Sequence, residues 1–134
     1  MANESSASSF TAHLRSILRI VLGFTFIQHG LQKVIGFQGG MMGGFQHLPT
    51  MLKVAGCLET AGGALLLVGL FTKFTAFILS GEMAAAYFMV HIHGGFWTIH
   101  NGGELAVVYC FVFLYLAFAG PGPLSLDGLL RKAA

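Results

Sequence analysis

The sequence predicts an all-α integral membrane protein, a bundle of four transmembrane helices with both termini in the cytoplasm and a short interfacial C-terminal segment. Of its 134 residues, 55% are hydrophobic and only 9% are charged, and the mean hydropathy is +0.77. Soluble domains usually carry about 25% charged residues, and a soluble chain this small could not cover so much apolar side chain. We therefore expect lipid to be the solvent of its surface.

Four apolar stretches have lengths near the roughly 20 residues that a membrane helix needs. They cover residues 14–35, 51–71, 74–93 and 104–120. Only helices can cross as single spans, because unpaired backbone groups are not tolerated in hydrocarbon. The short link Thr72-Lys73 forces the second and third spans into an antiparallel hairpin. Residues 14–120 are thus expected to form one four-helix membrane domain.

The two ends of the chain are expected to lie outside the hydrocarbon. Residues 1–13 lack the basic region of a secretory signal and predict a polar, disordered cytoplasmic head. Pro121 and Pro123 stop the fourth helix. Residues 121–134 then predict an interfacial tail, in which three leucines face lipid and two cations reach phosphates: Leu126, Leu129, Leu130, Arg131 and Lys132.

The distribution of lysine and arginine predicts the orientation. Five of these residues fall on the side of the termini, namely Arg15, Arg19, Lys73, Arg131 and Lys132. Lys33 and Lys53 fall on the other side, so the positive-inside rule places both termini in the cytoplasm. We expect a multi-pass protein of a bacterial or archaeal inner membrane. The cations are too few and too scattered for nucleic acid to be a partner.

Glu59 and Glu82 lie deepest in the predicted spans. A charged group there costs about 2.5–3.5 kcal/mol on insertion scales, so such groups usually face the bundle interior and mark function. Glu59 shares its helix face with four small residues that permit close helix packing: Ala55, Gly56, Gly62 and Gly63. Glu82 shares a face with His93 at its outer end. Both glutamates are therefore expected to point into the bundle.

Polar side chains gather in the outer half of the predicted bundle and suggest a polar-headed pocket above an apolar floor. Such a pocket suits a quinone, whose carbonyls need donors and whose reduction needs proton carriers. We expect a quinone between the first, second and fourth spans. The candidate proton-relay residues are His29, Glu59 and Glu104, and the candidate binding residues are Gln32, Lys33, Glu82, His93 and Asn101. The alternative is that these groups only join helices, for example by an ion pair of Glu59 with Lys33 or His29.

The segment His91-Ile-His93 followed by His100 is a weak metal signal. Neighbours two apart on a helix point about 200° from each other, so His91 and His93 could share an ion only where the helix unwinds. Haem held by His29 with His91 or His93 is a further alternative. We expect no metal site, and the roles of His91, His100, Cys57 and Cys110 stay open.

Four motifs, in order along the chain, resemble those of DoxX-like membrane proteins. They are H-G-L-Q-K (29–33), E-T-A-G-G-A-L-L-L-V-G-L-F-T-K (59–73), N-G-G-E (101–104) and G-P-G-P-L-S-L-D-G-L-L (120–130). The resemblance covers nearly the whole chain. It implies a four-span inner-membrane protein, with motif positions at Gly30, Lys33, Glu59, Glu82, Asn101 and Glu104.

DoxD-type members of this group are subunits of an archaeal thiosulfate:quinone oxidoreductase, and other members belong to membrane oxidoreductase complexes that respond to thiol stress. The resemblance therefore implies quinone-linked oxidoreduction of the thiosulfate or thiol type. The chain shows no flavin or CxxC motif, so a partner redox subunit is expected to donate electrons. Two alternatives remain: a non-catalytic scaffold or lipid-ligand carrier, and a haem- or metal-bearing electron carrier. Homo-oligomerisation is left open.

Overall fold

The computed structural model describes residues 2–39 and 45–133, which form helices and irregular links but no strand. The long helices are α1 (Ala2–Ile35), α2 (Thr50–Val68), α3 (Thr72–Met89) and α5 (Glu104–Ala119). The short elements are η1 (Phe37–Gly39), η2 (Phe45–His47), η3 (His91–Gly94), α4 (Thr98–Asn101) and α6 (Leu126–Ala133). The all-α architecture with four main helices is confirmed.

Three segments are long and apolar enough to cross a membrane: Ser8–Ile35, Thr50–Val68 and Thr72–Gly94. The apolar helix α5 is shorter, at 16 residues. Large apolar side chains cover the outside of the bundle, including Phe24, Phe74, Phe77, Phe111 and Phe118. Contact with hydrocarbon accounts for this surface, so the chain is a multi-pass membrane protein.

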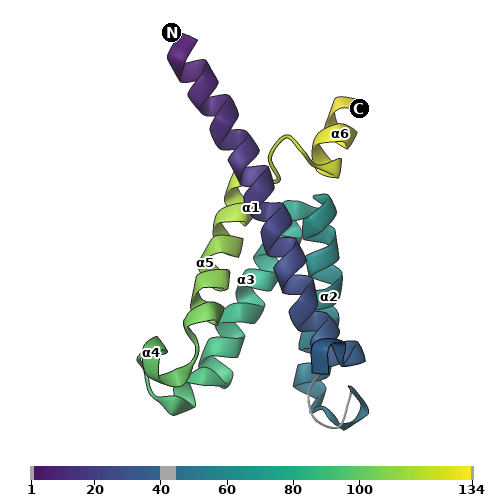
Figure 1. Ribbon diagram of the computed structural model, residues 1–134, viewed down its shortest axis with the longest axis vertical. Helices are drawn as coiled ribbons and strands as arrows, with labels where there is room; N and C mark the ends of the chain where they lie inside the picture. Colours follow the sequence, from purple (N-terminus) through teal and green to yellow (C-terminus); the bar gives the residue numbers. More distant parts are fainter. Residues whose placement is uncertain (1, 40–44, 134) are drawn as a thin grey trace.

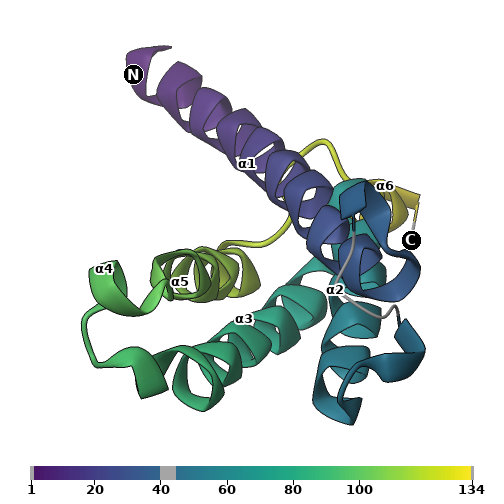
Figure 2. The same cartoon turned by 60° about the horizontal axis from the view of Figure 1, so that its bottom comes forward.

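The four long helices form two antiparallel pairs, α1 with α2 and α3 with α5 (Figure 1). The pairs meet at the end where the chain starts and finishes, here called the terminal end. They diverge toward the opposite end, here called the loop end, which carries η1, η2, η3 and α4 (Figures 1 and 2). This divergence leaves the two pairs apart over the half of the bundle where the sequence places its polar residues.

Two glycines let α1 and α2 pack backbone to backbone. A Cβ on Gly23 would lie 2.6 Å from the backbone nitrogen of Leu67, and a Cβ on Gly63 would lie 2.7 Å from that of Ile27. No real side chain tolerates such distances, so both positions require glycine. The face of α2 that carries Glu59 therefore packs on α1, as its small residues predict.

Aromatic rings join the two pairs in the middle of the bundle. Phe26 of α1 is 1% exposed, and its ring meets that of Phe113 of α5 edge to face at 4.8 Å between centroids. Tyr109 stacks on Phe113 at 5.5 Å. This contact closes the terminal half of the bundle, while the loop half stays open.

Arg19 organises the terminal end. Its side chain is fully buried, and its guanidinium donates hydrogen bonds to the carbonyls of Leu66, Leu67, Pro121 and Leu124. We call Arg19 and these four carbonyls the Arg19 cluster. It binds the end of α2 and the segment after α5 to α1. The sequence interpretation counts Arg19 only as a cytoplasmic positive charge. In the structure it is a buried side chain whose hydrogen bonds join three segments of the chain.

The C-terminal segment is anchored by Asp127 of α6. Its carboxylate accepts hydrogen bonds from the backbone N–H groups of Phe71 and Thr72, both at 2.8 Å, at the start of α3. Leu129 and Leu130 stay exposed, as expected for an interfacial tail. At the other terminus, α1 is helical from Ala2, within the segment expected to be a disordered head.

A candidate ligand cavity between the helix pairs

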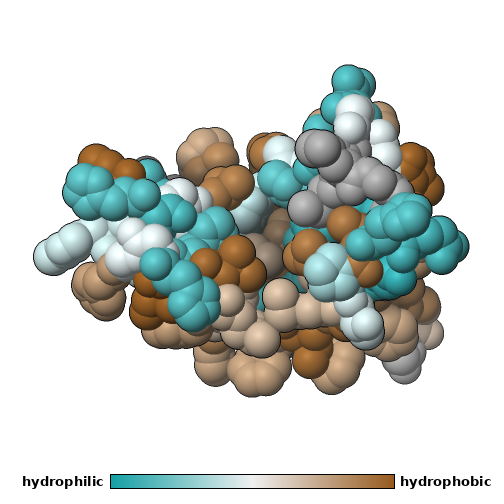
Figure 3. Space-filling model, turned by 90° about the horizontal axis from the view of Figure 1, so that it is seen from below, coloured by the Kyte–Doolittle hydropathy of each residue, from teal (hydrophilic) through white to brown (hydrophobic). Residues whose placement is uncertain are grey.

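A cavity of about 630 Å³ lies between the two helix pairs in their diverging half. Seen from the loop end, the surface is hollowed between the pairs (Figure 3). All four long helices line the cavity, and its size is typical of small-molecule sites. The predicted pocket is thus present, although α3 lines it as well as the three spans between which the ligand was expected.

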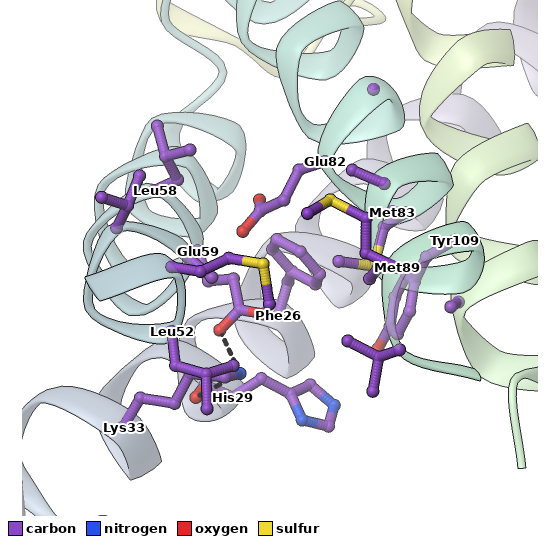
Figure 4. A pocket seen from close by; sticks show the side chains of 18 of the residues that line it. Phe26, His29, Lys33, Leu52, Leu58, Glu59, Glu82, Met83, Met89 and Tyr109 are labelled. Carbon is purple, nitrogen blue, oxygen red and sulfur yellow. Dashed lines mark hydrogen bonds and ion pairs between the residues drawn. The ribbon is translucent and has the colours of Figure 1, made fainter. Parts of the chain in front are cut away.

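Lys33 of α1 and Glu59 of α2 form an ion pair on the cavity wall (Figure 4). Lys33 Nζ lies 2.6 Å from Glu59 Oε2, and their side chains are 16% and 6% exposed. Lys33 Nζ also donates to the carbonyl of His29 at 3.4 Å. The pair neutralises both charges and joins α1 to α2, which is the helix-joining role that the alternative interpretation expected.

Glu82 of α3 also points into the cavity (Figure 4), but none of the residues that the structure describes pairs with it. Both carboxyl oxygens are buried and make no hydrogen bond within the described part of the chain. Buried polar atoms nearly always have a partner, and each exception needs an explanation. The ammonium of Lys33 is already held by Glu59. Glu82 is therefore a polar group inside the cavity for which the described residues supply no partner.

Aromatic side chains of α1 and α5 form the opposite wall. The rings of Phe26 and Tyr109 meet edge to face at 5.2 Å, and the His29 ring lies 6.2 Å from that of Tyr109. The Tyr109 hydroxyl donates to Thr25 Oγ1 at 3.1 Å. This wall offers aromatic rings for packing, together with an imidazole and a phenol group.

The rest of the lining is apolar and comes from α2 and α3. It includes Leu52, Ala55, Leu58, Ile78, Met83 and Met89. Methionine side chains are flexible and polarisable, so they adapt to ligand rings of different outline. A molecule with a polar head and an apolar body matches this distribution.

Four of the eight predicted site residues line the cavity and four do not. Those that line it are His29, Lys33, Glu59 and Glu82. Gln32, His93 and Glu104 are exposed and lie outside its lining. The expected alignment of His93 with Glu82 fails because α3 ends at Met89, so a helical face cannot extend to residue 93. His91 lines the cavity in its place.

Asn101 shapes the turn between α3 and α5. Its side-chain amide donates to the carbonyl of Gly95 at 2.7 Å, and its side-chain oxygen accepts from the N–H of Gly103, also at 2.7 Å. Its backbone carbonyl accepts from His91 Nδ1 at 3.2 Å. These contacts give the first part of the N-G-G-E motif a structural explanation, separate from ligand binding.

A metal site needs several ligand side chains close together, whereas haem needs only two histidines, and both His29 and His91 line the cavity. No group of three or more His, Cys, Asp or Glu side chains within residues 2–39 and 45–133 is placed to hold a metal ion. Cys57 and His100 are exposed, and Cys110 is half-buried beside the hydroxyl of Ser80.

Tyr109 is a polar residue of the cavity lining that the sequence interpretation does not single out. It lies in an apolar span, where a phenol hydroxyl needs a partner, so its presence there is itself a signal of a polar neighbour. Thr25 on the first span is that neighbour. No pattern within α5 alone could have paired the two residues, because they belong to different helices.

Comparison with known proteins agrees with this architecture. A family model described as DoxX matches residues 14–92, more than half of the chain. An uncharacterized protein of Haemophilus influenzae is 45% identical over 127 residues, covering 92% of this chain and 95% of the relative. The inner membrane protein YqjF of Escherichia coli is 31% identical over 130 residues, covering 87% and 91%.

A Bacillus subtilis protein named "Putative oxidoreductase CatD" is 28% identical over 118 residues, covering 87% of this chain and 86% of the relative. No solved structure matches the chain. The family match includes α1, α2 and α3, and thus Lys33, Glu59 and Glu82. Together with the four ordered motifs and the four-helix fold, these matches show that the chain belongs to the DoxX family of membrane proteins.

Proposed function

We propose that the protein binds a membrane quinone in the cavity and takes part in quinone-linked oxidoreduction as a subunit of a larger complex. The observation that carries the proposal is Glu82, whose buried carboxyl group faces the cavity and has no partner among residues 2–39 and 45–133. Such a group is costly in a membrane domain and marks function by default. A ligand head group that hydrogen-bonds to it would remove that cost.

The residues present fit a quinone. Its ring would pack against Phe26 and Tyr109. Its two carbonyl oxygens, which only accept hydrogen bonds, would accept them from the protonated Glu82 carboxyl on one side and from the His29 imidazole on the other. A bound quinone supplies chemistry in which two electrons and two protons are taken up or released. The chain's own part is to orient the ring, to exclude water, and to hold or deliver protons at the Glu82 carboxyl and the His29 imidazole.

A partner subunit supplies the electrons in this proposal, because the sequence carries no flavin or CxxC motif. The CatD relative, named as an oxidoreductase, favours the same class of reaction. The thiosulfate or thiol donor is the one implied by DoxD-type proteins. We place the protein in the inner membrane with both termini in the cytoplasm, so the loop end of the cavity faces outward.

A non-catalytic scaffold is the second candidate. The Lys33–Glu59 ion pair and the glycine contacts between α1 and α2 favour it, because both have complete structural explanations. It leaves Glu82 without an explanation, which is why quinone binding is preferred.

The test uses the full chain in lipid nanodiscs, with mass spectrometry of retained small molecules and thermal unfolding with added decylubiquinone. We expect a retained quinone and a higher unfolding temperature with decylubiquinone. Tyr109→Leu, which removes the aromatic wall, should weaken binding about tenfold. Tyr115→Leu removes a ring that is 48% exposed outside the cavity lining, and should have no effect.

A protein that retains no quinone and is not stabilised by decylubiquinone would leave the scaffold as the better description. Equal effects of the two tyrosine substitutions would show that the quinone binds to the lipid-facing surface instead of the cavity.

A further inference from the structure

We propose that the ligand reaches the cavity sideways from the bilayer, between α2 and α3, and keeps its hydrocarbon tail in that opening when bound. This inference rests on the proposed function and specifies its ligand as a quinone with an alkyl or isoprenoid side chain. We call the opening the α2–α3 gap, and define it by Val54 and Leu58 of α2 with Ile78, Gly81 and Ala85 of α3, all of which line the cavity.

The gap begins where direct contact between α2 and α3 stops. A Cβ on Gly62 of α2 would lie 2.8 Å from the Leu79 side chain of α3, so the helices touch at this level. Gly81 lies further along α3 toward the loop end, and a Cβ placed there would meet no atom within 4 Å. The two helices diverge toward the loop end (Figures 1 and 2), and the free space around a Cβ on Gly81 indicates that no side chain fills the opening at this position.

The rim of the gap is apolar and faces outward. Val54 is 53% exposed, Leu58 37% and Ile78 39%, and all three also line the cavity. They lie in segments that span the membrane, so their exposed surface meets hydrocarbon. Contact with such a rim does not stabilise a polar, water-soluble ligand, whereas it is favourable for an alkyl chain.

The polar contact for the head group lies just inside the rim. Glu82 follows Gly81 directly, and its carboxyl oxygens are buried in the cavity with no hydrogen-bond partner among the described residues. A tailed quinone could therefore place its ring between Glu82 and the Tyr109 wall while its tail leaves past Gly81 (Figure 4). A tail-less ring needs no gap, and could use the loop end beside Lys33 and His91.

The test compares two probes, decylubiquinone and the tail-less 2,3-dimethoxy-5-methyl-1,4-benzoquinone, on the full chain in nanodiscs. In Gly81→Leu the new side chain fills the gap. We expect it to weaken decylubiquinone binding by about tenfold or more, because several tail methylenes lose their site. Binding of the tail-less quinone should change by less than about twofold.

Two further variants control for folding and for bulk. Gly81→Ala adds one methyl group into open space and should weaken decylubiquinone binding less than Gly81→Leu does. Ala64→Leu makes the same kind of enlargement on an exposed position of α2 outside the cavity lining, and should leave both quinones unaffected. Thermal unfolding of each variant without ligand reports whether the fold is kept.

The lateral route is overturned if Gly81→Leu leaves decylubiquinone binding unchanged, or if it weakens both probes equally while Gly81→Ala does too. Failure of the proposed function has a different signature, because then the unsubstituted protein binds neither probe.

Discussion

Arg19 and Glu82 are both ionisable side chains within the membrane domain, and the chain provides for them in opposite ways. The guanidinium of Arg19 is fully buried and hydrogen-bonded to four backbone carbonyls from α2 and the C-terminal segment. The carboxyl oxygens of Glu82 are also buried, yet no described residue bonds to them. A buried polar group with all its partners stiffens a fold, while one without partners costs stability.

The two side chains lie in different parts of the bundle, Arg19 at the terminal end and Glu82 in the diverging half. At the terminal end the Arg19 guanidinium is hydrogen-bonded to backbone carbonyls of the protein itself, and these bonds tie α1 to α2 and to the C-terminal segment. Toward the loop end the helices diverge (Figure 1), and there the buried Glu82 carboxyl has no partner among the described residues, which is the partner that we propose a ligand supplies. The Lys33–Glu59 pair lies between these extremes, because it is satisfied by the chain but borders the cavity.

Removing the Arg19 cluster should have the largest effect on the stability of the protein. Arg19→Met removes the donors to four carbonyls and should lower the free energy of unfolding by about 3 kcal/mol, since bonds from a charged donor contribute about 1.5–3 kcal/mol each and are not additive. Thermal or denaturant unfolding in bicelles measures this loss. Arg19→Lys keeps the charge but lacks the planar fork, so we expect only partial recovery. An Arg19→Met protein with an unchanged free energy of unfolding would show that the Arg19 cluster does not stabilise the terminal end.

Breaking the ion pair should come next. Lys33→Met leaves the Glu59 carboxylate unpaired among apolar neighbours and should cost about 2 kcal/mol. The double variant Lys33→Met with Glu59→Gln removes both charges and should regain most of that loss. A double-mutant cycle of unfolding free energies measures the coupling. Additive losses would mean that the two side chains do not act as a pair.

The smallest effect concerns Asp127, which belongs to the same end as Arg19. Burial raises the pKa of its carboxyl, but hydrogen bonds from Thr72 and Phe71 and the nearby Arg131 outweigh this and lower the pKa below its ordinary value of 3.8. The Asp127 carboxylate caps the start of α3 by accepting the N–H groups of Phe71 and Thr72. This stabilising contribution is therefore fully present above about pH 4, and it is lost as the pH falls through the lowered pKa of Asp127 in the folded protein.

Asp127→Ala should destabilise the protein by about 1 kcal/mol at pH 7, the usual cost of losing a helix cap. The difference from the unsubstituted protein should shrink as the pH falls below about 4. Unfolding free energies at pH 7 and pH 3 measure both effects. A difference that stays constant with pH would exclude the carboxylate as the cap.

The fold was largely predictable because hydrocarbon dictates it. Four apolar stretches predict the four main helices, and the small residues around Glu59 predict close packing on a neighbouring helix, which the structure identifies as α1. The short link predicts an antiparallel pair of the second and third spans, whereas the closest pairs in the structure are α1 with α2 and α3 with α5. The left-handed backbone of Phe71, with φ of +51°, could not be foreseen, because a phenylalanine rarely adopts it. It is held by a hydrogen bond to a residue 56 positions away.

The cavity was predictable only in part, for a related reason. Polar residues are rare inside apolar spans and are easily recognised there, so the cavity residues His29, Lys33, Glu59 and Glu82 could be found from sequence alone. His93 was misplaced because the helical face was extended past the true end of α3. The divergence of the helix pairs depends on contacts between helices far apart in sequence, so the residue pattern within any one span does not predict it.

The most direct test of the account compares Glu82→Leu with Glu59→Leu. Glu82→Leu removes a carboxyl group that has no partner in the described part of the chain, so the ligand-free protein should become more stable, by about 1 kcal/mol, and should lose its stabilisation by decylubiquinone. Glu59→Leu strands the Lys33 ammonium and should destabilise the protein. Thermal unfolding of both variants, with and without decylubiquinone, gives the answer. A less stable Glu82→Leu protein that still responds to the quinone would contradict the claim that the chain reserves Glu82 for a ligand.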